Sequence, residues 1–151
     1  SRAAAVDVAI GDARLSLERE LRDGLGGRAY DVFAVDAFTG DAIPVHLLTR
    51  EAFALYFAMM NPDGVLALHV SNRYLDLMPV VRGLARERGL EALRIEQEED
   101  AWNAVEASTW MLVTRDAAFV DRLRASAEPA EPDARTLVWT DAFSSVIGVL
   151  K

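Results

Sequence analysis

The chain has 151 residues, a formal net charge of −8, 52% hydrophobic residues and 26% charged residues. This composition is typical of one packed globular domain and excludes a disordered chain. The acidic balance, with no cluster of lysine and arginine, argues against nucleic acid as a partner.

Two further features narrow the class of protein. The longest uninterrupted apolar run, residues 53–60, is far shorter than the roughly 20 residues that span a bilayer, so we expect no membrane contact in this chain. The chain has no cysteine, which excludes disulfides and thiolate metal sites, and His46 and His69 lie too far apart for a helical zinc motif. We therefore expect no metal and a cytoplasmic location.

The hydrophobic pattern predicts strands and helices that alternate along the chain. A β-branched run at residues 6–10 predicts the first strand, and Ala13, Leu17 and Leu21 then recur at helical spacing up to Gly24. The other expected elements, in chain order, are a strand at 30–35, a helix at 49–60, a turn at 61–64, a strand at 65–70, a helix at 73–88, strands at 91–97 and 109–114, a helix at 116–125, a loop at 127–134, a strand at 136–139 and a helix at 143–150. This alternation predicts a single α/β domain with a mostly parallel sheet and helices on both faces.

Five polar residues fall next to the carboxyl ends of predicted strands, where open α/β sheets bind their ligands: Asp12, Asp36, His69, Ser71 and Asn72. Asp12, between a strand and a helix, is either an N-cap or a carboxylate that contacts a nucleoside. Asp36 is followed by a loop and not by a helix, which favours chemistry: a carboxylate here can hold a cationic amine and take its proton. His69 ends the third strand and is a candidate for the same cleft.

Other polar positions have simpler interpretations. Asp41 is equally consistent with an Asx-type turn and with a second substrate-binding carboxylate. His46, just before a helix, is more typical of a packed or capping group than of a general base. The glycine-rich residues 24–27 follow a helix and precede a strand, the reverse of a dinucleotide-binding fingerprint, and no P-loop motif supports phosphoryl transfer.

Four motifs carry a resemblance to a known family: GDARLSL at 11–17, YDVFAVDAFTGDAIPVHLLT at 30–49, NPDGVLALHVSNRYLDL at 61–77 and WTDAFSS at 139–145. Together they resemble the spermidine synthase-like proteins, in the branch often fused to a transporter-like membrane segment. The resemblance implies the Rossmann-like fold of class I S-adenosylmethionine-dependent methyltransferases. It also implies transfer of an aminopropyl group from decarboxylated S-adenosylmethionine to putrescine or a related amine.

The resemblance also implies roles for single residues. Asp36 matches the family's catalytic aspartate, which positions and deprotonates the attacking amine. Asp12 matches the aspartate that contacts the adenine, with Ala13 beside it. Asp41 and His69 are then candidates for substrate binding, although the family's usual Asp-x-x-Asp-Pro pattern is shorter than the spacing from Asp36 to Asp41. No tightly bound cofactor is implied, because decarboxylated S-adenosylmethionine, or S-adenosylmethionine itself, acts as a co-substrate.

The strand order implied by the resemblance is 3-2-1-4-5-7-6, and its first two strands, with their glycine-rich turn, would precede residue 6. We therefore expect this chain to be the C-terminal part of the family fold, inactive or nearly so alone, and to be the cytoplasmic domain of a protein with an upstream transporter-like segment. The unpaired strand edge predicts a homodimer. Two alternatives stay open: an S-adenosylmethionine-dependent methyltransferase, and a non-catalytic regulatory domain that binds a polyamine or a nucleoside.

Overall fold

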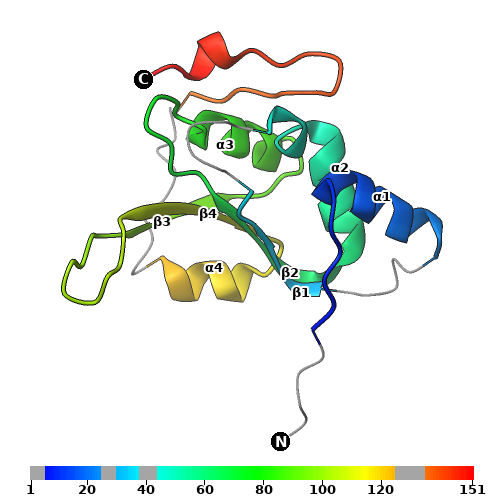
Figure 1. The fold of residues 1–151 in the computed structure, drawn as a ribbon, viewed down its shortest axis with the longest axis horizontal. Coiled ribbons are helices and arrows are strands. Elements are labelled where there is room, and N and C mark those ends of the chain that lie inside the picture. The colour runs from blue at the N-terminus through cyan, green and yellow to red at the C-terminus, as the bar shows by residue number, and fades with distance from the viewer. Residues whose placement is uncertain (1–5, 25–29, 38–43, 125–134) are drawn as a thin grey trace, which may run out of the picture.

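The computed structural model describes residues 6–24, 30–37, 44–124 and 135–151. At its centre is a sheet of four strands: β1 (Tyr30–Val35), β2 (Met60–His69), β3 (Ala92–Gln97) and β4 (Ser108–Thr114). The helices α1 (Ala13–Arg22), α2 (Arg50–Met59) and α3 (Met78–Arg86) lie above one face of the sheet, and α4 (Ala117–Leu123) lies below the other (Figure 1). Short 3₁₀ helices are found at Val45–Leu47 and Val146–Val149. The expected α/β class is confirmed.

The order of the strands is β1-β2-β4-β3. β1 runs parallel to β2, whereas β4 is antiparallel to both β2 and β3. The sheet is therefore mixed: the expectation of a mostly parallel sheet is met only in part, because β4 runs against the other three described strands. The cause is that β3 and β4 follow each other along the chain and pair directly, with Gln97 opposite Ser108, so the chain must reverse its direction between them.

Three helices begin at an N-cap residue whose side chain accepts a hydrogen bond from the first turn of the helix. Thr49 accepts a hydrogen bond from the backbone N–H of Ala52, which confirms the expected start of α2. Asp12 and Asp116 cap α1 and α4 in the same way. A cap side chain satisfies a backbone donor that the first helical turn leaves free, so these helix starts depend on local chemistry alone.

The helix expected at 73–88 begins later, at Met78. The side chain of Asn72 accepts hydrogen bonds from the backbone N–H groups of Tyr74 and Leu75, at 2.9 and 2.8 Å, and holds this segment in a turn. Leu75 also forms a bridge with Leu150 near the C-terminal end of the chain. The expected helix start at residue 73 is wrong because these contacts take the backbone groups that the first helical turn would use.

The strand expected at residues 6–10 does not form. Val6 and Val8 are each 82% exposed and Ile10 is 98% exposed, although their alternating pattern is that of a buried strand. A strand exists only where another strand supplies hydrogen-bond partners, and the described sheet ends at β1. Residues 6–10 have the composition of a strand without a neighbour to pair with.

Three further expectations are corrected. Residues 61–64, expected as a turn, belong to β2, and the pairing with β1 shifts register between Tyr30 and Val32 to accommodate them. Residues 136–139 form no strand, because they pack against α3 and not beside another strand. The backbone N–H of Leu137 donates to the carbonyl of Pro79 in α3 at 2.9 Å. Residues 143–150 contain only the 3₁₀ helix Val146–Val149. The loop expected at 127–134 lies outside the described residues.

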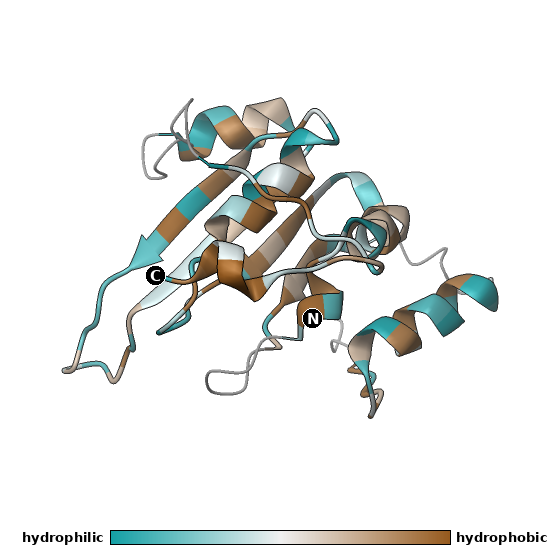
Figure 2. Ribbon diagram, turned by 90° about the horizontal axis from the view of Figure 1, so that it is seen from above, coloured by the Kyte–Doolittle hydropathy of each residue, from teal (hydrophilic) through white to brown (hydrophobic). Residues whose placement is uncertain are grey.

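The main core lies between the sheet and the layer that contains α2 and α3. Its largest fully buried side chains include Tyr56 and Phe53 from α2, Met111 from β4 and Trp139 from the C-terminal segment. Figure 2 shows hydrophobic residues gathered on the central strands, whereas hydrophilic residues alternate with them along β3 at the sheet edge. Among the described residues, no helix is long and apolar enough to cross a membrane.

The C-terminal segment passes very close to α3. A Cβ atom added to Gly83 would lie 2.0 Å from the carbonyl oxygen of Leu137. Only glycine permits this approach of backbone to helix, and the approach carries Trp139 into the core. The N–H of Arg50 then donates to the Trp139 carbonyl at 2.8 Å, which ties the same segment to the start of α2.

Candidate active site

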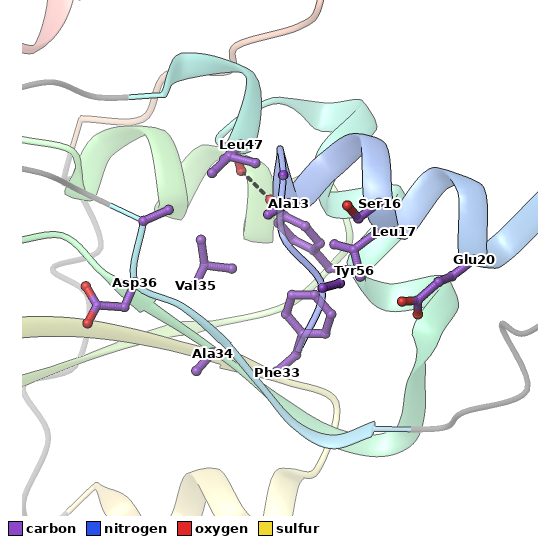
Figure 3. Close-up of a pocket in the computed structure, with 13 residues that line it drawn as sticks. Ala13, Ser16, Leu17, Glu20, Phe33, Ala34, Val35, Asp36, Leu47 and Tyr56 are labelled. Atoms are coloured by element: carbon purple, nitrogen blue, oxygen red, sulfur yellow. Dashed lines mark hydrogen bonds between the residues drawn. The ribbon is translucent and has the colours of Figure 1, made fainter. Parts of the chain in front are cut away.

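A pocket of about 340 Å³ opens beside the carboxyl end of β1. Figure 3 shows β1 forming one wall and α1 the other, with the rings of Phe33 and Tyr56 between them. The two rings stack with their centroids 4.9 Å apart, and the Tyr56 hydroxyl donates to the Leu47 carbonyl at 3.0 Å. Burial raises the pKa of Tyr56, so its ring acts as a neutral wall of the pocket. The lining is mainly apolar, with carboxylates at Asp36 and Glu20.

Asp36 lies in this lining, as expected for a residue that follows a strand. Its Oδ1 atom is 2.8 Å from Nδ1 of His69, and its side chain is 58% exposed. Within the described part of the chain, its other carboxylate oxygen has no hydrogen-bond partner. The structure therefore brings Asp36 and His69 together, and Asp36 still has one oxygen available to a ligand.

His69 lies behind Asp36 and does not line the pocket. Its Nε2 atom is 2.8 Å from the hydroxyl of Ser71, and its ring stacks on Trp110 with a centroid distance of 5.0 Å. Both ring nitrogens and one ring face are thus engaged by the protein. The expected role of His69 in binding substrate directly is untested, but this geometry favours a supporting role.

Asp12 acts as the N-cap of α1. Its Oδ1 accepts from the Leu15 N–H at 2.9 Å, and its Oδ2 is 3.0 Å from Nε2 of His46. The backbone hydrogen bond from Leu15 is the main cause that lowers the pKa of Asp12. The capping interpretation is confirmed, and the contact with a nucleoside stays a prediction. Asp12 itself does not line the pocket, whereas its neighbours Gly11 and Ala13 do.

Asp41, the second carboxylate of the long motif, lies outside the described residues. Neither its turn interpretation nor its substrate-binding interpretation is tested. Among the described residues, no group of three or more His, Asp or Glu side chains is arranged to hold a metal ion.

Sequence reasoning missed Glu20, whose carboxylate also reaches the pocket. Its Oε2 atom is buried and has no hydrogen-bond partner among the described residues. A signal was present: Glu20 follows Ala13 and Leu17 at helical spacing, so it lies on the face of α1 that turns toward the sheet. An acidic residue on an otherwise apolar helix face is the pattern that identifies it.

A partly buried arginine joins α1 to the C-terminal segment next to this site. The Arg14 guanidinium, 12% exposed, forms a bidentate pair with Asp141, with Nη1 2.6 Å from Oδ1. Asp141 also accepts from the Thr49 hydroxyl at 2.7 Å. The Arg14 guanidinium lowers the pKa of Asp141 to about 2, and Asp141 in turn raises the pKa of Arg14. This pair fixes the position of α1, which forms one wall of the pocket.

We expect the Asp141→Asn variant to be less stable by about 1–2 kcal/mol at pH 7, because a hydrogen-bonded charge pair is lost but Asp141 is partly screened by solvent. The folded-state pKa lies below the usual 3.8, so the stabilisation is complete above that value and is lost as the pH falls through about 2. Urea unfolding at pH 7 and pH 2.5 measures both effects.

The control for this prediction is Glu87→Gln, which breaks the more exposed pair of Glu87 with Arg50. That loss should stay below about 1 kcal/mol. Equal losses in the two variants, or an Asp141→Asn effect that does not shrink in acid, would contradict the assigned role.

One comparison found a partial similarity to a known protein. A stretch of 56 residues, 37% of this chain, is 43% identical to a polyamine aminopropyltransferase of Vibrio vulnificus (strain CMCP6). Part of the chain is similar to an aminopropyltransferase. The match covers 18% of that relative's length, and no family model matches the chain. The resemblance to the spermidine synthase-like proteins is thus supported for a segment, and fusion to a transporter-like segment stays a prediction.

Proposed function

We propose that this chain carries the amine-handling part of an aminopropyltransferase site, with Asp36 as the catalytic base. The observation that carries the proposal is the placement of Asp36: it follows β1, lines a mainly apolar pocket and has one carboxylate oxygen without a partner among the described residues. The buried, unpartnered Oε2 of Glu20 in the same lining adds a second negative group. Two carboxylates on an apolar wall suit a cationic amine with a hydrocarbon stem.

The partial similarity to a polyamine aminopropyltransferase supports this assignment. The strand order gives further support, because β1-β2-β4-β3 with an antiparallel β4 corresponds to strands 4-5-7-6 of the class I methyltransferase order. On that correspondence, the co-substrate is decarboxylated S-adenosylmethionine, and Asp12 and Ala13 contact its adenine. Asp41 remains a proposed second contact for the amine.

For this reaction the protein needs only to position the amine and to remove its proton. The amine nitrogen attacks the carbon next to the sulfonium, so a C–N bond forms while the C–S bond breaks. Methylthioadenosine leaves as a neutral thioether, and the amine proton passes to Asp36. An in-line attack of this kind needs a deprotonated, oriented amine and no covalent enzyme intermediate.

The test is to incubate the natural protein that contains this sequence, and this chain alone, with putrescine and decarboxylated S-adenosylmethionine. Spermidine and methylthioadenosine in equal amounts would support the proposal, with little or no product from the chain alone. Methylated product formed from S-adenosylmethionine would instead indicate a methyltransferase. Ligand binding without product from either protein would indicate a regulatory domain.

We also propose that the free edge of β1 mediates a homodimer. No described strand pairs with this edge, and Val32 is 65% exposed on it. An unpaired apolar edge is a template for pairing with a second copy. Light scattering should give a mass that approaches that of a dimer as concentration rises, and Val32→Lys should keep the chain monomeric. A monomer at all concentrations would contradict the proposal.

A further inference from the structure

A chain of hydrogen bonds runs from the start of β4 to the proposed base. The backbone N–H of Thr109 donates to the Ser71 hydroxyl oxygen at 2.7 Å, and that oxygen is 2.8 Å from Nε2 of His69. Nδ1 of His69 is 2.8 Å from Oδ1 of Asp36. These hydrogen bonds thus connect a backbone amide, whose direction the sheet fixes, to the carboxylate in the pocket.

The sheet register explains why these groups meet. Val35 of β1 pairs with Leu68 of β2, so the next residues along the two parallel strands, Asp36 and His69, are neighbours. His69 pairs directly with Trp110 on the antiparallel strand β4, which places the indole against the imidazole ring. The arrangement is therefore set by three adjacent strands, with Asp36 and Ser71 in the first residues after β1 and β2.

The Asp36 carboxylate decides where the imidazole proton resides. An ionised carboxylate can only accept a hydrogen bond, so Nδ1 of His69, which faces Asp36, carries the proton. In the neutral ring Nε2 is then an acceptor, and the Ser71 hydroxyl, whose oxygen accepts from the Thr109 N–H, donates to it. A neutral imidazole in this tautomer donates to the carboxylate and holds its Oδ1.

We propose, on the basis of the proposed function, that His69 is a positioning residue that holds Oδ1 of Asp36 and directs Oδ2 toward the amine. The Asp36 carboxylate sets the tautomer of His69, the Ser71 hydroxyl held by the Thr109 amide donates to Nε2, and Trp110 fixes the plane of the ring. His69 does not bind the substrate itself. This differs from the direct substrate contact that its place at a strand end suggested.

The tautomer is measured without any assay of function. Long-range ¹H–¹⁵N spectra of the chain at neutral pH should show a protonated Nδ1 and an unprotonated Nε2 for His69. Ser71→Ala removes the donor to Nε2 and should change the ¹⁵N shift of that atom while the proton stays on Nδ1, whereas Ser108→Ala, which removes a neighbouring hydroxyl at the start of β4, should leave that shift unchanged. A proton on Nε2 in the unmodified chain, or equal spectra for the two serine variants, would overturn the proposal.

Kinetics of the natural protein give the second measurement. An asparagine at position 69 keeps an N–H donor near the place of Nδ1, while a glutamine carries its amide farther out, near Nε2. We expect His69→Asn to stay within about 5-fold of the unmodified kcat and His69→Gln to lose about 10- to 100-fold, with KM little changed in both. A raised KM with unchanged kcat would show a substrate ligand and overturn the positioning role.

The two proposals fail in different ways. If the unmodified protein transfers no aminopropyl group, the proposed function fails, and the spectra still decide whether His69 donates from Nδ1 to Asp36. If transfer occurs but His69→Gln is as active as His69→Asn, the proposed function stands and the positioning role is wrong. Folding of each variant is checked by its unfolding midpoint in urea.

Discussion

Replacing Asp36 by asparagine should reduce aminopropyl transfer by about 10²- to 10⁴-fold, the contribution expected of a positioned general base. Asparagine has nearly the same shape, and its amide oxygen can still accept the hydrogen bond from His69. The variant therefore keeps the pocket and removes the negative charge and the site for the proton. The loss should fall on kcat and on kcat/KM together.

The matched control is Asp31→Asn, which removes an aspartate from β1, the strand that Asp36 follows. Asp31 bonds to Asn61 at 2.6 Å and does not line the pocket. Its replacement should leave product formation within about 2-fold of the unmodified protein, as is usual for a surface change. Full activity in Asp36→Asn, or equal losses in both variants, would show that Asp36 is not the base.

Gly83→Ala should destabilise the fold by about 3 kcal/mol or more, at the upper end of the range for overpacked interiors. The new Cβ would lie 2.0 Å from the Leu137 carbonyl oxygen and 2.7 Å from the carbonyl carbon. These are backbone atoms, so no side-chain rotation can relieve the clash. Helix propensity alone predicts the opposite sign, because alanine stabilises a helix interior by roughly 1 kcal/mol relative to glycine.

Urea unfolding monitored by circular dichroism and by tryptophan fluorescence measures the Gly83→Ala effect. The combination of Gly83→Ala with Leu137→Ala tests its cause, since removal of the Leu137 side chain should rescue nothing if the backbone is the obstacle. A stabilised Gly83→Ala variant, or a rescue by Leu137→Ala, would contradict the close approach of this segment to α3.

Local chemistry made several elements predictable from the sequence. Thr49 and Asp116 each have a side chain that caps the helix following it, and Asp12 does the same for α1. The strand–end position of Asp36 was also predictable, because an apolar run that stops at a carboxylate needs no knowledge of distant residues. These features depend on neighbours within one helical turn or one strand.

Features that depend on distant residues were not predictable. The strand pattern at residues 6–10 was correct in composition but has no described partner to pair with. The shortened α3 follows from contacts between Leu75 and Leu150, far apart in the chain. The link from Ser71 through His69 to Asp36 exists only because β1, β2 and β4 lie side by side. A single sequence does not reveal which strands become neighbours.

The pair of Arg14 with Asp141 has a consequence for the order in which the molecule assembles. The two residues are separated by 127 positions, so their contact closes a long loop. During synthesis this pair cannot form until Asp141 has been made, whereas β2, β3 and β4 can pair earlier. Because α1 is one wall of the pocket, we expect that wall to reach its final position after the sheet has formed.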